Sequence, residues 1–492
     1  MNRRRMLSEC AGGFALAALA PRFASAFQTP SPQPLEDSRY GLVVTTESNP
    51  WRQGAILKPA FSFEMLNLNI EPEKTLPTGA AIDGFGACFN ELGWTSLQAL
   101  GEADRESVLR EFFDPAAGAR FTYCRMPIGA NDFATEAYSY DETDGDFDLK
   151  HFSIDHDRRT LIPFIQAALR YQPKLRLWAS PWSPPSWMKR NHFYAESKAY
   201  PGQKDNGIRP DQVGHEGEDM FIQDPRYFAA YARYFGRFID AYQAEGIRVG
   251  MVMPQNEFNS AQNFPSCTWT PEALARFLHD LGPEMQKRGV DVFFGTLERG
   301  NPRMLETVMA DKEAARFVKG VGAQWAGKNA LPAIHVKYPG LVIYQSEQEC
   351  GFGENSWAYA GYCWHLMKHY FRSGATAYMY WNISTAKGGM STWGWPQNSL
   401  VSVDRAAKTF HYNHDYYLLK HVSHFVEVGA RSLAVSGTCD DALAFRNPDG
   451  GCVVVVRNEL SHPQLVQVQV GERAVAINLP ADSIGTLTVK AG

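Results

Sequence analysis

The feature that most constrains the fold is an alternation that repeats between residues 81 and 382. Each repeat has a short run of β-branched and aromatic residues followed by a longer amphipathic stretch, which is typical of βα units and a parallel sheet. Eight strands with crossovers in about 300 residues predict a (β/α)8 TIM barrel of the α/β class. The eight expected strands are residues 81–89, 121–128, 175–180, 248–254, 291–297, 320–325, 341–345 and 375–382.

A doubly wound α/β sheet is the alternative architecture. It is disfavoured because Gly84-Phe85-Gly86, in the first expected strand, lacks the third glycine of a phosphate-binding loop. The helix before the fourth strand is predicted from aromatic residues between Phe228 and Tyr242, which recur at three- and four-residue steps before Gly246 ends the helix.

The two ends of the chain carry a different pattern. Residues 38–78 contain short extended pieces, and residues 425–492 alternate apolar and polar side chains around turn residues. We expect these two segments to form one accessory β-sandwich beside a barrel of residues 79–424. Residues 27–37 contain three prolines and are interpreted as a flexible lead-in.

Residues 1–26 are interpreted as a signal peptide. Arginines at positions 3 to 5 precede a small apolar run, and residues 24–26 have the small-x-small form of a cleavage site. The paired arginines resemble a twin-arginine signal, which predicts a bacterial protein in the periplasm or secreted from the cell. A membrane anchor is the alternative, but the apolar run is shorter than the roughly 20 residues of a bilayer span.

Composition excludes several classes of function. With 48 Lys and Arg against 53 Asp and Glu, the formal charge of −5 gives no basic surface for nucleic acid, and no other stretch predicts a membrane span. The sequence contains no C-x-x-C pattern, so a zinc ribbon is not expected. Cys439 and Cys452 flank a turn and either form a disulfide or remain separate thiols. The sequence gives no indication of the oligomeric state.

Two glutamates directly follow expected strands. Glu257 follows the fourth strand and Glu347 follows the seventh, three βα units later, which places them on facing sides of the barrel rim that carries active sites. Facing carboxyls suit glycosidic bond cleavage, because one protonates the leaving oxygen and the other attacks or activates water. Glu349 is an alternative to Glu347 as the carboxyl that attacks or activates water. A pair of solvated glutamates at loop starts is the alternative interpretation.

Tryptophans also gather at the expected strand ends. Their rings offer flat apolar faces on which sugar rings stack, and six on one rim exceed what packing usually requires. The six are Trp182, Trp187, Trp325, Trp381, Trp393 and Trp395.

Six segments in chain order carry a family resemblance. They are GFGACFNELGW, RMPIGANDF, ASPWSPPSWMK, MPQNEFN, YQSEQECG and STWGWPQNSLVSVD. Together they resemble glycoside hydrolase family 30, the retaining β-glycosidases that include glucosylceramidases and endo-β-1,6-glucanases. The resemblance implies a TIM barrel with a β-sandwich from both chain ends, and retaining glycosidases need no metal or other cofactor.

The resemblance also implies roles for individual residues. Glu257 would be the general acid/base, Glu347 the nucleophile, and Asn256 a hydrogen-bond donor to the sugar 2-hydroxyl. Further substrate-binding positions implied by the family pattern are Glu91, Arg125, Asp132, Trp182, Gln324, Trp325 and Trp393.

Two positions depart from the glucosylceramidase pattern. Glu91 replaces an aspartate that binds sugar hydroxyls, and Gln324-Trp325-Ala326 stands where those enzymes have His-Trp-Tyr. The missing tyrosine favours a β-glucan oligosaccharide over a ceramide glycoside as substrate.

The sequence therefore predicts a retaining β-glycosidase acting on β-glucosides or β-1,6-linked glucan. The alternatives are glucosylceramidase, β-xylosidase or β-fucosidase specificity, or a carbohydrate-binding protein that has lost catalysis. A metal site is not expected, because the helical pair His365 and His369 lacks the glutamate of a zinc protease motif. An esterase is disfavoured because no G-x-S-x-G elbow occurs.

Overall fold

The computed structural model describes residues 33–59, 65–76 and 80–491. The predicted signal peptide, residues 1–26, and residues 27–32 of the predicted lead-in lie outside the described residues. The boundaries of the predicted domains, 38–78 with 425–492 and 79–424, remain predictions.

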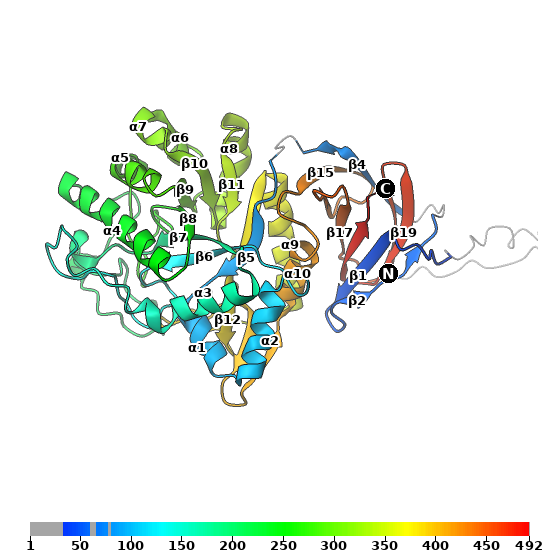
Figure 1. Cartoon of the computed structure of the whole chain (residues 1–492), viewed down its shortest axis with the longest axis horizontal. Helices are drawn as coiled ribbons and strands as arrows, with labels where there is room; N and C mark the ends of the chain where they lie inside the picture. The colour runs from blue at the N-terminus through cyan, green and yellow to red at the C-terminus, as the bar shows by residue number, and fades with distance from the viewer. Residues whose placement is uncertain (1–32, 60–64, 77–79, 492) are drawn as a thin grey trace, which may run out of the picture.

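Eight parallel strands form the barrel, which occupies the left part of Figure 1. Strand β12 pairs with both β11 and β5, so the sheet closes on itself. Each barrel strand overlaps one of the eight runs expected from the sequence, and the TIM-barrel prediction is confirmed. The strands are β5 (Gly84–Cys88), β6 (Tyr123–Ile128), β7 (Arg176–Pro181), β8 (Val249–Val252), β9 (Asp291–Leu297), β10 (Val318–Ala323), β11 (Val342–Gln345) and β12 (Ala375–Ala386).

Helices surround the barrel and begin at recognisable capping residues. The side chain of Asp224 accepts a hydrogen bond from the backbone N–H of Arg226 at the start of α4, and Pro225 occupies the first turn. That helix ends at Ala244, two residues before Gly246, whose φ is +79°. The helices are α1 (Glu91–Gln98), α2 (Glu102–Phe113), α3 (Leu161–Tyr171), α4 (Pro225–Ala244), α5 (Pro271–Gln286), α6 (Arg303–Ala310), α7 (Lys312–Ala315), α8 (Leu331–Lys337), α9 (Trp357–Arg372) and α10 (His414–Ser423).

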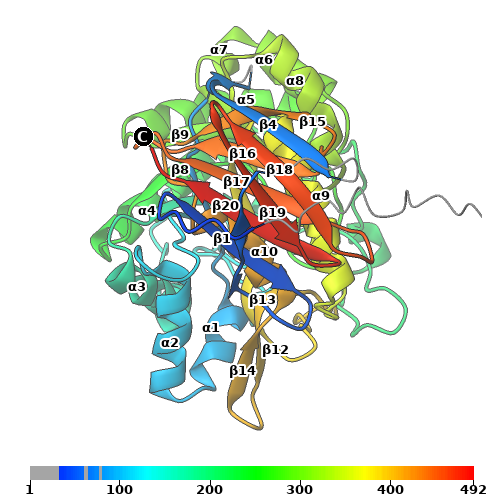
Figure 2. The ribbon, with the colours of Figure 1, turned by 90° about the vertical axis from the view of Figure 1, so that its right-hand side faces the viewer.

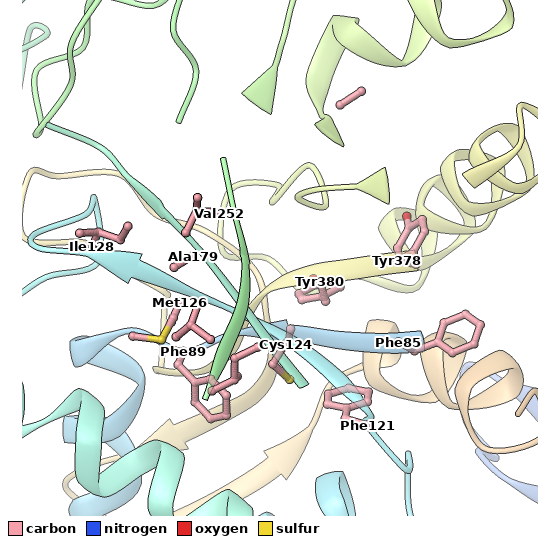
Figure 3. Packing of buried hydrophobic residues seen from close by; sticks show 14 of the residues in the cluster. Phe85, Phe89, Phe121, Cys124, Met126, Ile128, Ala179, Val252, Tyr378 and Tyr380 are labelled. Carbon is pink, nitrogen blue, oxygen red and sulfur yellow. The ribbon is translucent and has the colours of Figure 1, made fainter. Parts of the chain in front are cut away.

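The barrel strands alternate side chains between two apolar layers. Outward residues such as Phe85, Cys124 and Met126 pack under the helices, as Figure 3 shows for part of this cluster. Inward residues form a separate interior cluster that includes Tyr123 and Trp178. Arg125 lies between the outward residues Cys124 and Met126, so its side chain points into the barrel, above the interior cluster.

Strand β12 extends beyond the barrel. The 12-residue β12 continues past its barrel partners and pairs with β13 (Ser399–Asp404), which in turn pairs with β14 (Thr409–Tyr412). The sequence prediction ended this strand at residue 382 and did not include β13 or β14. The extension matters for the site because the loop between β12 and β13 carries Trp393 and Trp395.

The second part of the structure is a β-sandwich beside the barrel, which is seen face-on in Figure 2. Strands from the two chain ends alternate in it, because β1 pairs with β20 and β4 lies between β15 and β18. The predicted sandwich from both chain ends is therefore confirmed. Its strands are β1 (Tyr40–Thr46), β2 (Arg52–Gln53), β3 (Ile56–Leu57), β4 (Leu66–Thr75), β15 (Arg431–Gly437), β16 (Ala442–Arg446), β17 (Cys452–Asn458), β18 (Gln464–Val470), β19 (Arg473–Leu479) and β20 (Ser483–Val489).

The structure also distinguishes between a disulfide and two separate thiols at Cys439 and Cys452. Cys439 and Cys452 are both buried in the sandwich core as free thiols, so they form no disulfide. Their apolar surroundings explain their burial without a covalent role.

Candidate active site

A cavity of about 640 Å³ opens at the carboxyl ends of the barrel strands. Both predicted catalytic glutamates, Glu257 and Glu347, line it. Each lies directly beyond a strand end, where the loops of a TIM barrel form the active site. The predicted residues Asp132, Trp182, Asn256 and Trp325 line the same cavity.

Arg125 lies beneath the cavity wall and contacts two residues that line it, Glu347 and Asn256. Its buried guanidinium contacts Glu347 Oε2 at 2.5 Å through Nη1, and its Nη2 donates to Asn256 Oδ1 at 2.7 Å and to Ser180 Oγ at 2.9 Å. The guanidinium carbon also lies 4.4 Å from the ring centroid of Trp182. Such a cation among aromatic rings and fixed acceptors has little freedom to move, so Arg125 fixes the positions of Glu347 and Asn256.

Asn256 presents its amide nitrogen to the cavity. Three donors converge on its Oδ1: Arg125 Nη2, Thr296 Oγ1 at 3.2 Å and Gln324 Nε2 at 3.3 Å. Within the described residues Nδ2 has no hydrogen-bond partner. A donor is therefore left for a ligand hydroxyl beside the two glutamates.

Glu257 is held by neutral groups. Its backbone N–H donates to Thr296 Oγ1 at 2.8 Å, and Gln324 Nε2 donates to its Oε1 at 3.0 Å. Ser346 Oγ donates to Gln324 Oε1 at 2.8 Å, which fixes the Gln324 amide so that its N–H groups face Glu257. The residue has a φ of +44°, a strained conformation for a non-glycine residue that is found most often at functional sites.

Burial and charge set the electrostatics of the two glutamates. Burial raises the pKa of Glu257, and the hydrogen bond from Gln324 opposes that rise. Burial also raises the pKa of Glu347, while the positive charge of Arg125 favours its ionised form. The direct ion pair belongs to Glu347, so of the two carboxyls only Glu347 has a cation in contact with it among the described residues.

Asp132 is a third carboxyl in the cavity. Burial, followed by the charge of Glu257, raises the pKa of Asp132 to about 7. Its Oδ2 accepts from Gln397 Nε2 at 3.3 Å, whereas its Oδ1 has no partner among the described residues. An unpaired polar atom at this depth is costly unless a ligand or water satisfies it, which is consistent with a hydroxylated ligand.

Other predicted residues have different positions. Gln324 lies behind the cavity wall and contacts Glu257 from there. Glu91, at the start of α1, is not part of the wall. Its carboxylate accepts from Thr135 N at 2.9 Å and from Thr160 Oγ1 at 2.8 Å, and His156 Nε2 lies 2.9 Å from it. Trp393 packs on apolar residues beside the cavity, and it is Trp395 that reaches the wall.

The six tryptophans predicted at the rim have different positions in the structure. Trp182, Trp325 and Trp395 line the cavity. Trp187 instead belongs to the core, where its indole N–H donates to the Asp141 carbonyl at 3.0 Å. Trp182 and Trp187 lie on the same proline-rich loop but pack in different apolar clusters.

The rival nucleophile Glu349 lines the cavity as well. Its carboxylate contacts Lys328 Nζ at 2.6 Å and accepts from the Tyr362 hydroxyl at 2.6 Å. These contacts neutralise it at the rim, whereas Glu347 lies on the floor beside Arg125.

Several wall residues were not predicted from the sequence. Glu298 follows β9 directly, the same signal that identified Glu257 and Glu347, and it was not recognised. Burial and the charge of Glu257 raise the pKa of Glu298 to about 8. Tyr200, Gln262 and Gln397 come from long loops and carry no comparable signal in the sequence.

Metal ligands do not cluster anywhere in the described part of the chain: no group of three or more His, Cys, Asp or Glu residues is placed to hold an ion. His365 lies 2.9 Å from Glu459, and His369 contacts the Lys328 carbonyl. None of the described helices is both long enough and apolar enough to cross a bilayer.

Comparison with known proteins agrees with this arrangement. The profile of the glycosyl hydrolase family 30 TIM-barrel domain matches residues 82–426, and that of the family 30 beta sandwich domain matches residues 429–487. The lysosomal acid glucosylceramidase of Mus musculus is 29% identical over 428 residues, which cover 80% of this chain and 78% of the relative. The endo-1,6-beta-D-glucanase of Neurospora crassa is 27% identical over 413 residues, which cover 79% of this chain and 81% of the relative.

Solved structures share the fold. SrfJ from Salmonella typhimurium superposes with a TM-score of 0.79 at 23% identity, covering 92% of this chain and all of that one. The endo-β1,6-glucanase BT3312 gives a TM-score of 0.77 at 23% identity, covering 92% of this chain and 99% of that one. Domain matches over most of the chain confirm the resemblance seen in the six sequence segments, and the chain belongs to glycoside hydrolase family 30, making it a glycoside hydrolase.

Proposed function

We propose that this glycoside hydrolase cleaves β-glucosides or β-1,6-linked glucan with retention of configuration, using Glu347 as nucleophile and Glu257 as acid/base. The observation that carries the assignment is the difference between their partners. Glu347 contacts the Arg125 cation at 2.5 Å, whereas Glu257 receives a neutral amide donor at 3.0 Å and has no ion pair among the described residues. A cation stabilises the ionised form of a carboxyl, and burial without one favours the protonated form.

The two roles account for both steps of the reaction. In the first, a Glu347 oxygen forms a bond to the anomeric carbon while the glycosidic C–O bond breaks, and Glu257 gives its proton to the departing oxygen. In the second, water attacks the anomeric carbon, Glu257 takes the proton from that water, and the bond to Glu347 breaks. Both carboxyls return to their starting protonation states.

Neighbouring groups support the transition state. The free Asn256 Nδ2 is positioned to donate to the sugar 2-hydroxyl, a hydrogen bond that strengthens as positive charge develops on the ring. Trp182 offers an aromatic face at the same depth, and the unpartnered Asp132 Oδ1 offers an acceptor. Ring stacking together with a few directed polar groups is the usual composition of a sugar site.

The proposed sugar class rests on the relatives. Those that match most of the chain include an enzyme named for β-1,6-glucan and one named for glucosylceramide, and glucose is the sugar common to both names. The Ala326 side chain in the cavity wall, where the glucosylceramidase pattern has a tyrosine, supports a glucan as the substrate.

Stereochemistry and rescue test this proposal. Proton NMR of a hydrolysed aryl β-glucoside should show the β-anomer of glucose before mutarotation, whereas the α-anomer as first product would contradict retention. The Glu257→Ala variant should lose activity on alkyl glucosides, keep it on substrates with good leaving groups, and be rescued by azide with formation of a β-glucosyl azide. If azide rescued Glu347→Ala in this way and not Glu257→Ala, the two roles would be reversed.

We also propose that the protein is exported, with residues 1–26 as the signal. The twin-arginine-like pattern supports this proposal. Fractionation of a bacterial host that expresses the full chain should recover the enzyme from the periplasm or medium, and the Arg3→Lys, Arg4→Lys, Arg5→Lys triple variant should accumulate in the cytoplasm. Equal export of both forms would contradict the assignment.

A further inference from the structure

Glu349 lines the catalytic cavity but has no part in the proposed mechanism. It lies two residues after the proposed nucleophile Glu347, on the loop that follows β11. Its Oε1 lies 2.6 Å from Nζ of Lys328, on the loop after the neighbouring strand β10, and its Oε2 accepts a hydrogen bond from the Tyr362 hydroxyl of α9 at 2.6 Å. One carboxylate therefore connects two loops of the rim with helix α9.

Lys328 uses the same ammonium group to hold a second residue. Its Nζ donates to the backbone carbonyl of Trp325, three residues earlier in the chain, at 3.0 Å. The side chains of Lys328 and Glu349 are only 21% and 13% exposed, so water and salt screen their attraction less than that of an exposed pair. The Lys328 carbonyl is fixed as well, because His369 Nε2 of α9 lies 3.0 Å from it. The ammonium group is therefore a fixed link between Glu349 and Trp325.

The backbone of Trp325 depends on such a link. Its φ is +47°, in the left-handed region that non-glycine residues seldom adopt and that surrounding contacts must maintain. Trp325 is 37% exposed, so packing holds it only in part. The segment that follows has little room to adjust, because a Cβ at Gly327 would lie 1.9 Å from the Leu297 carbonyl oxygen. The hydrogen bond from Lys328 therefore stabilises a backbone conformation that is otherwise unfavourable.

The Trp325 side chain acts on Glu257, which lines the same cavity. Burial raises the pKa of Glu257. The Gln324 amide, the Arg125 charge and a hydrogen bond from the Trp325 side chain lower that pKa. The indole nitrogen can only donate, so it is a second N–H donor to the carboxyl beside the Gln324 amide. A general acid must be correctly oriented to deliver its proton, and two donors restrict the orientation of Glu257.

We propose that Lys328 and Glu349 are positioning residues for the general acid: their ion pair holds Trp325 against Glu257 and so orients the carboxyl that protonates the leaving oxygen. This assignment rests on the proposed function, in which Glu257 is the acid, and it gives Glu349 a role other than that of a nucleophile. An ion pair that only stabilised the rim would change the amount of active enzyme and would affect every substrate alike.

The dependence of the rate on the leaving group tests this role. The full-length enzyme and its variants are assayed for kcat/KM on two substrates. The leaving group of 2,4-dinitrophenyl β-glucoside departs without a proton, whereas that of phenyl β-glucoside requires one from the general acid. The measured quantity is the ratio of the phenyl to the dinitrophenyl value, in which the concentration of folded enzyme cancels. A partly misfolded variant therefore keeps the wild-type ratio unless its general acid is displaced.

Lys328→Met should lower this ratio roughly three- to tenfold, the range for one lost hydrogen bond to Glu257. Glu349→Gln should also lower it, and the double variant should lower it no further than Lys328→Met does, because both changes break one pair. Lys328→Arg, which restores a cation, should recover most of the wild-type ratio. The matched control is Lys337→Met: Lys337 of α8 forms a 3.0 Å ion pair with Glu306 outside the cavity wall, and its loss should leave the ratio unchanged.

Glu257→Ala is the reference variant and should lower the ratio further than any of these changes. An unchanged ratio in Glu257→Ala would contradict the proposed function, and the positioning role with it. A ratio that falls in Glu257→Ala but keeps its wild-type value in Lys328→Met, or that falls equally in Lys337→Met, would overturn the positioning role and leave the catalytic assignment intact. Additive losses in the double variant would also overturn it, because Lys328 and Glu349 would then act separately.

Discussion

At the scale of single residues, Arg125 connects the stability of the barrel to the chemistry of the site. Its guanidinium is fully buried and contacts Glu347, Asn256 and Ser180, which belong to three other strand ends. A buried cation with so many partners is costly to remove, because the partner charge is then left without compensation. The same residue that favours the ionised form of Glu347 therefore also connects the strand ends at the top of the barrel.

Replacing Arg125 should expose this double role. We expect Arg125→Met to lower kcat/KM on an aryl β-glucoside on the order of 10²-fold or more and to lower the free energy of unfolding at pH 7 by about 3–5 kcal/mol. Without the cation, the folded-state pKa of Glu347 lies further above its unfolded value, so the stability deficit should shrink as pH falls and Glu347 takes up a proton. Urea unfolding at pH 7 and pH 5 measures this change.

A matched arginine provides the control for that experiment. Arg176 begins the adjacent strand β7, is half-exposed, and contacts Asp83 at 3.5 Å. Arg176→Met should cost less than about 1 kcal/mol, as exposed ion pairs do. Equal losses in the two variants, or a deficit in Arg125→Met that grows at low pH, would contradict the account of Arg125.

Gln324 should tune the pH range of activity. Its hydrogen bond lowers the pKa of Glu257 against the effect of burial, so Gln324→Leu should raise that pKa further. In the proposed mechanism Glu257 must be protonated to act, and the basic limb of the kcat/KM profile should therefore move to higher pH in the variant. The profile on an aryl β-glucoside with a poor leaving group measures the shift. A basic limb that stays in place or moves to lower pH would show that Gln324 does not contact the acid/base in solution.

At the scale of elements, the barrel depends on close approach between neighbouring strands. A Cβ at Gly86 in β5 would lie 1.9 Å from the carbonyl oxygen of Tyr123 in β6, the strand that carries Arg125. Backbone atoms cannot yield as a flexible side chain can, so any larger residue here must push the two strands apart.

Two glycine variants test this requirement. Gly86→Ala should lower the free energy of unfolding by about 1–3 kcal/mol or more. Gly250→Ala in β8 is the matched control, because the nearest atom to its added Cβ is the Leu177 carbonyl oxygen at 3.9 Å, and we expect a change within about 0.5 kcal/mol. Thermal or urea unfolding of both variants gives the comparison. Similar stabilities would mean that β5 and β6 are further apart than described.

The elements also show what the sequence can and cannot predict. Glu257 and Glu347 follow their strands directly, and parallel strands bring their carboxyl ends to one rim, so periodicity alone located both. The orientation of loop residues has no such rule: Trp393 and Trp395 are two residues apart, yet only Trp395 reaches the cavity wall. Tyr200 and Gln397 are brought to the site by long loops, whose paths depend on tertiary contacts that no local pattern records.

Glu91 illustrates a further difference. The family pattern implied a sugar contact, whereas in the structure its carboxylate is surrounded by Thr135, His156 and Thr160. A motif gives a residue's place along the chain, but hydrogen bonds to the following loop determine where its side chain points.

At the scale of the whole molecule, the barrel and the sandwich are joined through a buried histidine. His421 of α10 contacts Thr486 Oγ1 of β20 through Nδ1 and Thr45 Oγ1 of β1 through Nε2, both at 2.8 Å. Thr486 Oγ1 donates to the His421 carbonyl, so it accepts from Nδ1–H, and Nε2 is the acceptor for the Thr45 hydroxyl. The contact therefore requires the neutral ring, and burial lowers the pKa of His421 to about 3.

This contact predicts a loss of stability in acid. The folded state keeps His421 neutral while the unfolded chain binds a proton below pH 6.5, so stability falls with decreasing pH by up to about 1.4 kcal/mol per unit. His421→Gln cannot be protonated, and its loss of stability between pH 7 and pH 4.5 should be smaller than that of the wild type. His462→Gln, at an exposed position in the sandwich, is the control and should behave as the wild type does. An equal acid loss in His421→Gln would show that this histidine does not couple the two parts.

The central claim, that Glu347 is the nucleophile of a retaining glycosidase, is tested most directly by identifying the residue that carries the trapped sugar. The enzyme is treated with 2,4-dinitrophenyl 2-deoxy-2-fluoro-β-glucoside, digested with pepsin and analysed by tandem mass spectrometry. We expect one fluoroglucosyl group per chain, attached to Glu347 and absent from the Glu347→Gln variant. A label on Glu349, Glu257 or Glu298, or full hydrolytic activity in Glu347→Gln, would contradict the account.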